Sequence, residues 1–336
     1  MPSRKNLLQL PAPRAARMIA LSHLDAANAA CQRLPDPQDT EALHDFRVAL
    51  RRLRSGMRAY RPLLADTVSR KSQRRLRRLA RSTNEARDVE VRIAWLRSQA
   101  PHLPPRQRKG WLWLLDRLET HKDKLYREIH SRVAEDFPPL EQKLRRQLMR
   151  YTVVCDLDGR RHDVPFATIT GNEAKRHCDE LKHHLKRITS PADEALMHQA
   201  RIQAKRLRYL LEPIQTHLPE GEDIIKQLKN LQDVLGDLHD AHLDAREFAT
   251  TLETFAAERA RHLLDMTLDS EQDPARLRAE QRRNEHQGLM ALIRLARSRA
   301  ETLFAEIEAR YLEGGARELI QRIGDSAERL RADYDQ

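Results

Sequence analysis

The chain has 336 residues, of which 40% are hydrophobic, 33% charged and only 4% aromatic, and its formal net charge is +11. This length allows two domains or one large one with a substantial core, and the few aromatics and ten glycines favour an all-α fold over a sheet-rich one. No apolar run approaches the roughly 20 residues that cross a bilayer, no secretory signal is evident, and the three cysteines form no CxxC pair, so we expect a cytoplasmic protein.

Helical periodicity fills the first half of the chain, interrupted by prolines. The expected helices cover residues 14–33, 40–61, 65–85, 88–98, 106–135 and 140–150. One of the expected breaks is at Pro138 and Pro139. Residues 151–172 follow, with several β-branched residues and a possible turn at Asp158-Gly159, and we interpret them as a linker or a small hairpin.

Helical periodicity resumes in the second half. The expected helices cover residues 173–188, 191–216, 221–235, 238–258, 274–311 and 317–332. The predicted organisation is therefore an N-terminal helical bundle at 1–150, a linker or hairpin at 151–172, and a C-terminal helical bundle at 173–336.

Positive charge is concentrated in one segment. From His44 to Arg81 the sequence has thirteen Lys or Arg against Asp45 and Asp66, so this segment alone carries +11 and the rest of the chain sums to zero. A local field of this density predicts an anionic partner.

The expected helix at 40–61 has two faces. Its apolar residues recur at spacings of three and four and predict a stripe that faces the core: Phe46, Leu50, Leu53, Met57 and Tyr60. A second stripe is basic, with the same spacings: His44, Arg47, Arg51, Arg54 and Arg58. Like charges at such spacings repel, and the stripe spans roughly 21 Å at 1.5 Å per residue, which suits a linear polyanion better than a small ligand.

The basic pattern recurs in the second half at an offset of 154 residues. His44, Arg47 and the sequence RRLR at 51–54 match His198, Arg201 and KRLR at 205–208. The repeat indicates two copies of one helical unit, and two antiparallel bundles related by a pseudo-twofold axis would follow. If that axis brings the two copies together, their cations line a channel or groove.

We predict a phosphate-binding role for the residues of both copies and for cations on the helices that follow them, because the guanidinium fork binds phosphate with two parallel hydrogen bonds. The candidates are His44, Arg47, Arg51, Arg52, Arg54, Arg58, Arg74, Arg77, Arg78, His198, Arg201, Lys205, Arg206, Arg208, Lys226 and Lys229.

The paired motifs resemble the signature of the CHAD family, the conserved histidine α-helical domains, and the sequences ARDVEV (86–91) and LGDLHDAHL (235–243) are similar to its second landmark. The resemblance covers nearly the entire chain. It implies a pair of four-helix bundles around a basic central channel that binds inorganic polyphosphate, with targeting to polyphosphate granules. From the residues themselves we predict no catalytic residues, metal or cofactor, because the sequence contains no HExxH motif, no Ser/His/Asp arrangement and no glycine-rich phosphate loop. A CYTH triphosphatase domain often precedes this domain in the family, but we expect this protein to be a stand-alone CHAD protein.

One departure from the repeat is expected to matter. Glu212 occupies the position that matches Arg58, and residues 198–229 carry a net charge of only +2. The two halves of the site are therefore expected to be unequal.

An enzyme is the first alternative. The pairs His44-Asp45 and His239-Asp240 suggest a metal-dependent phosphohydrolase, but Gln199 replaces the first Asp in the repeat, so we expect Asp45 to orient a basic residue instead. A zinc site would need an unusual ligand spacing. Its candidate ligands are Cys155, His162, Cys178, His183 and His184.

Non-specific nucleic-acid binding is the second alternative, since phosphate contacts dominate affinity there too. Base stacking requires exposed aromatic rings, and residues 44–81 contain only Phe46 and Tyr60, both on the apolar stripe. Trp111 and Trp113 belong to a later helix and are expected to be packing residues. Neither a membrane partner nor an oligomeric state is predicted.

Overall fold

The computed structural model describes residues 7–36, 38–39, 41–65, 67–150, 164–268 and 285–332. These residues are almost entirely helical, and within these ranges there is no strand, only an isolated bridge between Pro11 and Pro165. The expected all-α class is confirmed. Most of the suggested hairpin, residues 151–163, lies outside the described ranges.

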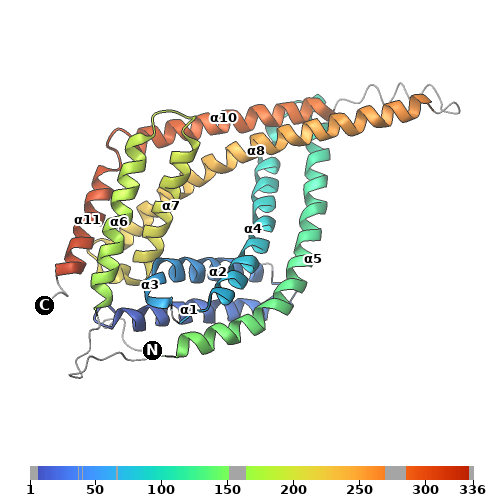
Figure 1. Ribbon diagram of the computed structural model, residues 1–336. Helices are drawn as coiled ribbons and strands as arrows, with labels where there is room; N and C mark the ends of the chain where they lie inside the picture. The colour runs from blue at the N-terminus through green and yellow to red at the C-terminus, as the bar shows by residue number, and fades with distance from the viewer. Residues whose placement is uncertain are drawn as a thin grey trace, which may run out of the picture. The chain divides into compact units, whose positions relative to one another are not determined.

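Figure 1 shows the order of the helices. The α-helices are α1 (Ala12–Arg33), α2 (Ala42–Ala59), α3 (Arg61–Leu64), α4 (Arg70–Gln99), α5 (Pro105–Met149), α6 (Phe166–Arg187), α7 (Glu194–Leu211), α8 (Gly221–Leu268), α10 (Glu285–Tyr311) and α11 (Arg317–Ala332). Short 3-10 helices, η2 (Ala100–His102) and η3 (Glu212–His217), follow α4 and α7. None of the described helices has the length and hydrophobicity that a membrane crossing requires.

The chain forms two compact units. Unit 1 comprises Met1–Glu85, Arg127–Leu235 and Ile307–Gln336, and unit 2 comprises Ala86–Tyr126 and Gly236–Glu306. Each unit combines segments from both halves of the sequence, and α4, α5, α8 and α10 each continue from one unit into the other. The division at residues 150 and 173 and the pseudo-twofold axis stay predictions.

The apolar stripe of α2 lies in the core of unit 1. Phe46, Leu50 and Leu53 are fully buried, and Phe46 packs edge to face against Phe137 of α5 with ring centroids 4.9 Å apart. Helix α1 packs beside α2, and α6 contacts both α7 and α11 (Figure 1). Burial of this stripe, as predicted, leaves the basic stripe on a different face of α2.

Two expected breaks do not occur, because packing outweighs local propensity. Helix α5 runs through Pro138 and Pro139, where the flanking Phe137 and Leu140 are buried and hold the backbone in place. Helix α4 likewise continues through the turn expected near residues 86–87, since Ala86 is buried.

Two other boundaries also differ from expectation. Helix α6 begins at Phe166 rather than residue 173, and buried Thr168 and Thr170 pack in its first turns despite their β-branched side chains. Helix α8 is continuous over Gly221–Leu268, whereas the sequence predicted two helices there.

Unit 2 has its own aromatic core. Trp95 stacks on Phe248 and Trp113 packs edge to face on Phe255, while the indole N–H of Trp111 donates to the carbonyl of Leu96 at 2.7 Å. These contacts confirm the expected packing role of Trp111 and Trp113.

Two glycines allow a close helix crossing in unit 2. A Cβ atom on Gly110 of α5 would lie 1.9 Å from the carbonyl oxygen of Glu285 and 2.9 Å from the Cα of Gly288 on α10. Only glycine fits at this approach.

Candidate functional site

Helices α2 and α7, which carry the two copies of the repeated motif, pack against each other in unit 1. The phenol of Tyr60 donates to the carbonyl of Leu210 at 3.4 Å, and the guanidinium of Arg51 lies over the ring of Tyr209, 5.9 Å from its centroid. Arg208 lies over the same ring at 4.7 Å. The two copies of the motif are therefore neighbours, which is the condition that the predicted channel or groove required.

Five cations gather where these helices meet, and we call them the cation cluster: Arg51, Arg54, Arg201, Lys205 and Arg208. All five are half-buried. Within the described part of the chain, none of them forms an ion pair with a carboxylate, and the buried Nε atoms of Arg51, Arg201 and Arg208 have no hydrogen-bond partner. The cluster is a concentration of positive charge without a direct ion pair among the described residues, and Glu212, which also attracts Arg51, pairs with the adjacent Arg52.

Lys205 lies at the centre of the cation cluster. Burial, together with repulsion by Arg201, Arg51, Arg54 and Arg208, lowers the pKa of Lys205 to about 8. Burial also lowers the pKa of Arg51 and of Arg54, with further repulsion from neighbouring cations. A multivalent anion would relieve this repulsion.

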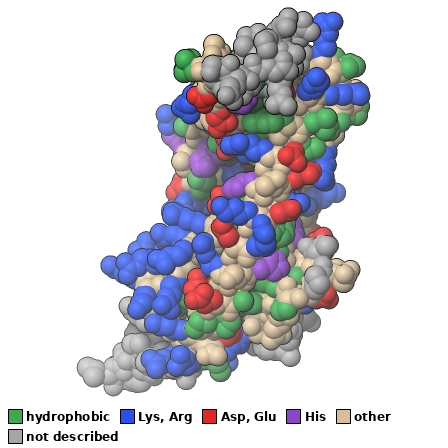
Figure 2. Space-filling model, turned by 90° about the vertical axis from the view of Figure 1, so that its right-hand side faces the viewer, with side chains coloured by type: hydrophobic (Ala, Val, Ile, Leu, Met, Phe, Trp, Pro, Cys, Tyr) green, Lys and Arg blue, Asp and Glu red, His purple; other side chains and the backbone are tan. Residues whose placement is uncertain are grey.

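The cation cluster continues onto α4 through Arg54. Besides burial, repulsion from Arg77, Arg58 and Arg81 lowers the pKa of Arg54, so these side chains are neighbours. The adjoining arginines line an open cavity of about 460 Å³, which we call the arginine pocket: Arg74, Arg77, Arg78, Arg81 and Arg132, with Ser82 and Glu85. Figure 2 shows lysine and arginine side chains gathered on the lower part of one face of the molecule.

Arg132 is a candidate that the sequence did not suggest. It lies on α5, where acids such as Glu128, Glu135 and Asp136 are interspersed with the bases. A mixed helix of this kind gives no charge signal, and only the fold brings Arg132 to the arginines of α4.

Arg52 and Arg206 differ from the other basic residues of their motifs. Arg52 pairs with Glu212, Nη2 to Oε1 at 2.5 Å, and Arg206 lies 4.0 Å from Glu180 and donates to the amide oxygen of Gln203 at 3.4 Å. The second residue of each four-residue motif thus has an acid nearby, as a direct ion pair for Arg52 and at 4.0 Å for Arg206, whereas the first and fourth residues belong to the cation cluster.

The two motif histidines lie in different environments. His44 is exposed near the start of α2, whereas His198 is half-buried and burial lowers its pKa, with added repulsion from Arg201 and Lys205. The neighbouring Asp45 accepts a hydrogen bond from Arg33 of α1 at 2.7 Å. Asp45 therefore pairs with a basic residue, as expected.

The remaining candidates have weaker connections to the site. Arg47 is half-buried on α2, and Arg58 is exposed but close to Arg54 and Arg206. Lys226 and Lys229 are exposed on α8, and Lys226 lies near Asp223, which binds Arg322. The contacts that define the cation cluster involve neither lysine.

The proposed zinc ligands are not brought together in the described ranges. Cys155 and His162 lie outside the described residues, and the buried thiol of Cys178 donates to the carbonyl of Ile320 at 3.4 Å. Burial raises the pKa of Cys178 to about 11. Among the residues described, no group of three or more His, Cys, Asp or Glu side chains is arranged to hold a metal ion.

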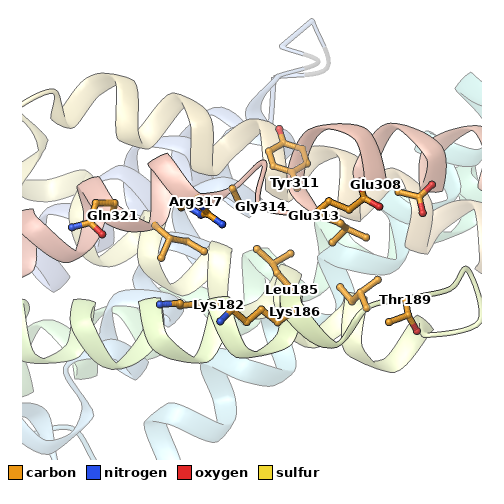
Figure 3. Close-up of a pocket in the computed structure, with 14 residues that line it drawn as sticks. Lys182, Leu185, Lys186, Thr189, Glu308, Tyr311, Glu313, Gly314, Arg317 and Gln321 are labelled. Atoms are coloured by element: carbon orange, nitrogen blue, oxygen red, sulfur yellow. The ribbon is translucent and has the colours of Figure 1, made fainter.

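A second cavity, of about 740 Å³, lies in unit 1 between α6 and the turn that joins α10 to α11 (Figure 3). Its wall combines Leu185 and Leu312 with the cations Lys182, Lys186 and Arg317. None of the predicted site residues lines it.

Comparison with known proteins places the chain in a family. The family model described as the CHAD domain matches residues 18–249. The chain therefore belongs to the CHAD family, as its paired motifs suggested. A comparison with curated protein sequences finds no match.

Two solved structures share the fold. The CHAD domain from the plant Ricinus communis is 18% identical with a TM-score of 0.58, over 97% of this chain and 94% of that one. PptA from Streptomyces chartreusis is 15% identical with a TM-score of 0.51, over 91% of this chain and 100% of that one. At such identities the likeness concerns the fold alone.

Proposed function

We propose that this protein binds inorganic polyphosphate at the cation cluster and the arginine pocket, and that it does so without catalysing a reaction. The proposal also includes the finer expectations from the family: two four-helix bundles around a basic channel, and association with polyphosphate granules.

The observation that carries the proposal is the unpaired state of the cation cluster in the described residues. Arginines that only solvate a surface usually have acids at neighbouring helical positions. Here acids of other elements lie close to Arg52 and Arg206, whereas Arg51, Arg54, Lys205 and Arg208 form no ion pair within the described residues. Half-buried cations without counter-charges are costly unless an anion binds, and arginine donors suit phosphate oxygens.

The spacing of the cations supports a linear ligand. Arg54 of the cation cluster neighbours arginines of the arginine pocket. Basic side chains of α2, α7, α4 and α5 therefore follow one another from the cation cluster to the arginine pocket. A single phosphate would neutralise only a part of this series. A chain of phosphates would contact many of these cations at once.

Nucleic acid is a less suitable ligand for this surface. Phe46 and Tyr60 are 0% and 1% exposed and cannot stack on bases, and the buried ring of Tyr209 is already covered by Arg51 and Arg208. Polyphosphate needs no aromatic contact. The ion pair of Asp45 with Arg33 also weighs against a hydrolase that uses Asp45 as a metal ligand.

A competition experiment tests the proposal. Labelled polyphosphate is titrated with the full chain at near-physiological salt and then displaced with unlabelled polyphosphate, single-stranded DNA, RNA or short oligophosphates. We expect displacement by polyphosphate at phosphate concentrations at which nucleic acid has little effect, and a steep loss of affinity with added salt. Equal displacement by nucleic acid would refute the proposal, and release of orthophosphate during the titration would refute its non-catalytic part.

A further inference from the structure

Lys205 has neighbours that are unusual for a lysine. Arg201 and Arg208 lie one turn away on either side of it along α7, and Arg51 and Arg54 approach from α2. Lys205 forms no ion pair with a carboxylate of the described residues. A primary amine thus has four guanidinium groups, from two adjacent helices, as its electrostatic neighbours, and each of them can bind phosphate.

We propose that Lys205 is a site of covalent acylation by acyl phosphates, small anions in which an activated carbonyl group is joined to a phosphate. The guanidinium groups would bind the phosphate of such a donor, as they bind any phosphate oxyanion, and this places the carbonyl carbon beside the amine. Lysines outside the cation cluster lack this binding site.

The reaction is a simple acyl transfer. The lone pair of the neutral Nζ attacks the carbonyl carbon, a C–N bond forms, and the C–O bond to phosphate breaks with its electron pair. Inorganic phosphate leaves, and the amine proton passes to water. The product at Lys205 is a neutral amide, and the arginines stabilise the negative charge of the leaving phosphate.

The environment also supplies the neutral amine. Burial and the four arginines lower the pKa of Lys205 to about 8. At pH 8, Lys205 is therefore neutral in roughly half of the protein molecules, whereas an ordinary lysine is neutral in less than about 1%. Repulsion among the cations thus activates the same amine whose donor the arginines bind.

Acylation would also regulate the site. This second part rests on the proposed function, because the neutral amide removes the central charge of the cation cluster and would weaken polyphosphate binding. An acylated chain would keep its arginines but lose the cation that they surround.

The test uses the full chain and acetyl phosphate at pH 8, with peptide mass spectrometry to measure the rate at each lysine. Exposed Lys109 and Lys124 are internal controls, because neither belongs to the cation cluster or lines the arginine pocket or the second cavity. We expect Lys205 to react about tenfold faster than either, given its larger neutral fraction. A rate at Lys205 equal to or below that of the controls would overturn the proposal.

A neutral donor distinguishes phosphate guidance from amine reactivity alone. With p-nitrophenyl acetate the preference for Lys205 should fall, and tripolyphosphate should block its reaction with acetyl phosphate but leave Lys109 unaffected. An equal preference with both donors would overturn the role of the arginines. In the variant Arg208→Gln, the rate with acetyl phosphate should fall relative to the rate with the neutral donor.

Binding measurements separate the two proposals. Lys205→Gln, which resembles the amide, should bind polyphosphate more weakly than Lys205→Arg if both proposals hold. Selective acetylation of a chain that does not bind polyphosphate would support acylation and refute the proposed function. Binding without selective acetylation would do the reverse.

Discussion

Arg52 of α2 and Glu212, the first residue after α7, form an ion pair at 2.5 Å that joins the two copies of the repeated motif. Glu212 is one of the positions at which the two copies differ, since the first copy has Arg58 at the matching position. The acid therefore neutralises one arginine of the other copy and leaves Arg51 and Arg54 unpaired within the described ranges. The negative charge that distinguishes the second copy from the first at this position is therefore used in the ion pair with Arg52.

This pair allows a matched comparison of two arginines on one helix. Arg54→Gln should weaken polyphosphate binding by about five- to tenfold, because it removes a charge-assisted contact from the cation cluster. Arg52→Gln should change affinity less than about twofold, since Glu212 already neutralises that side chain. Fluorescence anisotropy with labelled polyphosphate measures both, and circular dichroism checks the helical content. A larger loss from Arg52→Gln would contradict our assignment of the cation cluster.

Removing the acid should have the opposite effect. Glu212→Gln frees Arg52 and adds one positive charge beside the cation cluster, so affinity should rise about two- to fivefold and its salt dependence should steepen. The free energy of unfolding should change by less than about 1 kcal/mol, because both side chains retain solvent contact. Unchanged affinity and salt slope would mean that Arg52 is out of reach of the ligand.

Lys205 should stabilise the complex but destabilise the free protein. The pKa of Lys205 is lowered to about 8 in the folded chain, so the unfolded chain binds more protons between about pH 8 and pH 10.5, and stability rises with pH across that window. Below pH 8 the full cost of burying the charge is present. Lys205→Met should therefore raise the free energy of unfolding at pH 7 by roughly 1 to 3 kcal/mol while weakening binding. Urea titrations at pH 7 and pH 10 measure the difference, which should shrink at pH 10.

Polyphosphate binding should be coupled to proton uptake. Bound phosphates raise the pKa of Lys205, so the chain takes up protons on binding near pH 8 and affinity falls as the pH rises from 7 to 9.5. Calorimetry in two buffers of different ionisation enthalpy counts the protons. Lys205→Arg keeps the charge and should largely abolish the uptake. The same uptake in that variant would assign the titration to another group.

The glycine crossing gives a test of the fold in unit 2. Gly110→Ala places a Cβ atom against the backbone of α10 and should destabilise the protein by about 1 to 3 kcal/mol. Gly324→Ala is the matched control, because no atom lies within 4 Å of its Cβ position in α11, and it should stabilise by up to about 1 kcal/mol. Thermal unfolding measures both, and equal effects would contradict the close approach of α5 and α10.

Periodic patterns made much of this fold and site predictable. The stripes of α2 gave both its buried face and its basic face, and the repeat identified α7 as its counterpart. Local signals failed where long-range packing decides, as at Pro138 and Pro139, where a buried neighbour keeps α5 helical.

The distribution of roles within the motifs was not predictable in the same way. Adjacent residues such as Arg51 and Arg52 look alike in sequence, and only the position of Glu212 across the helix pair separates them. The role of Arg132 was not predictable either, because it lines the arginine pocket only through the packing of α5 near α4, and its neighbours in the sequence do not indicate this.

The ring of Tyr209 also orders two side chains of the cation cluster. It contacts the guanidinium groups of Arg51 and Arg208 through its π electrons, and so uses none of their N–H donors. Two long side chains from different helices are thereby held in place before any ligand arrives. Side chains that are already ordered lose less conformational entropy on association, so a greater part of their attraction for the ligand contributes to affinity.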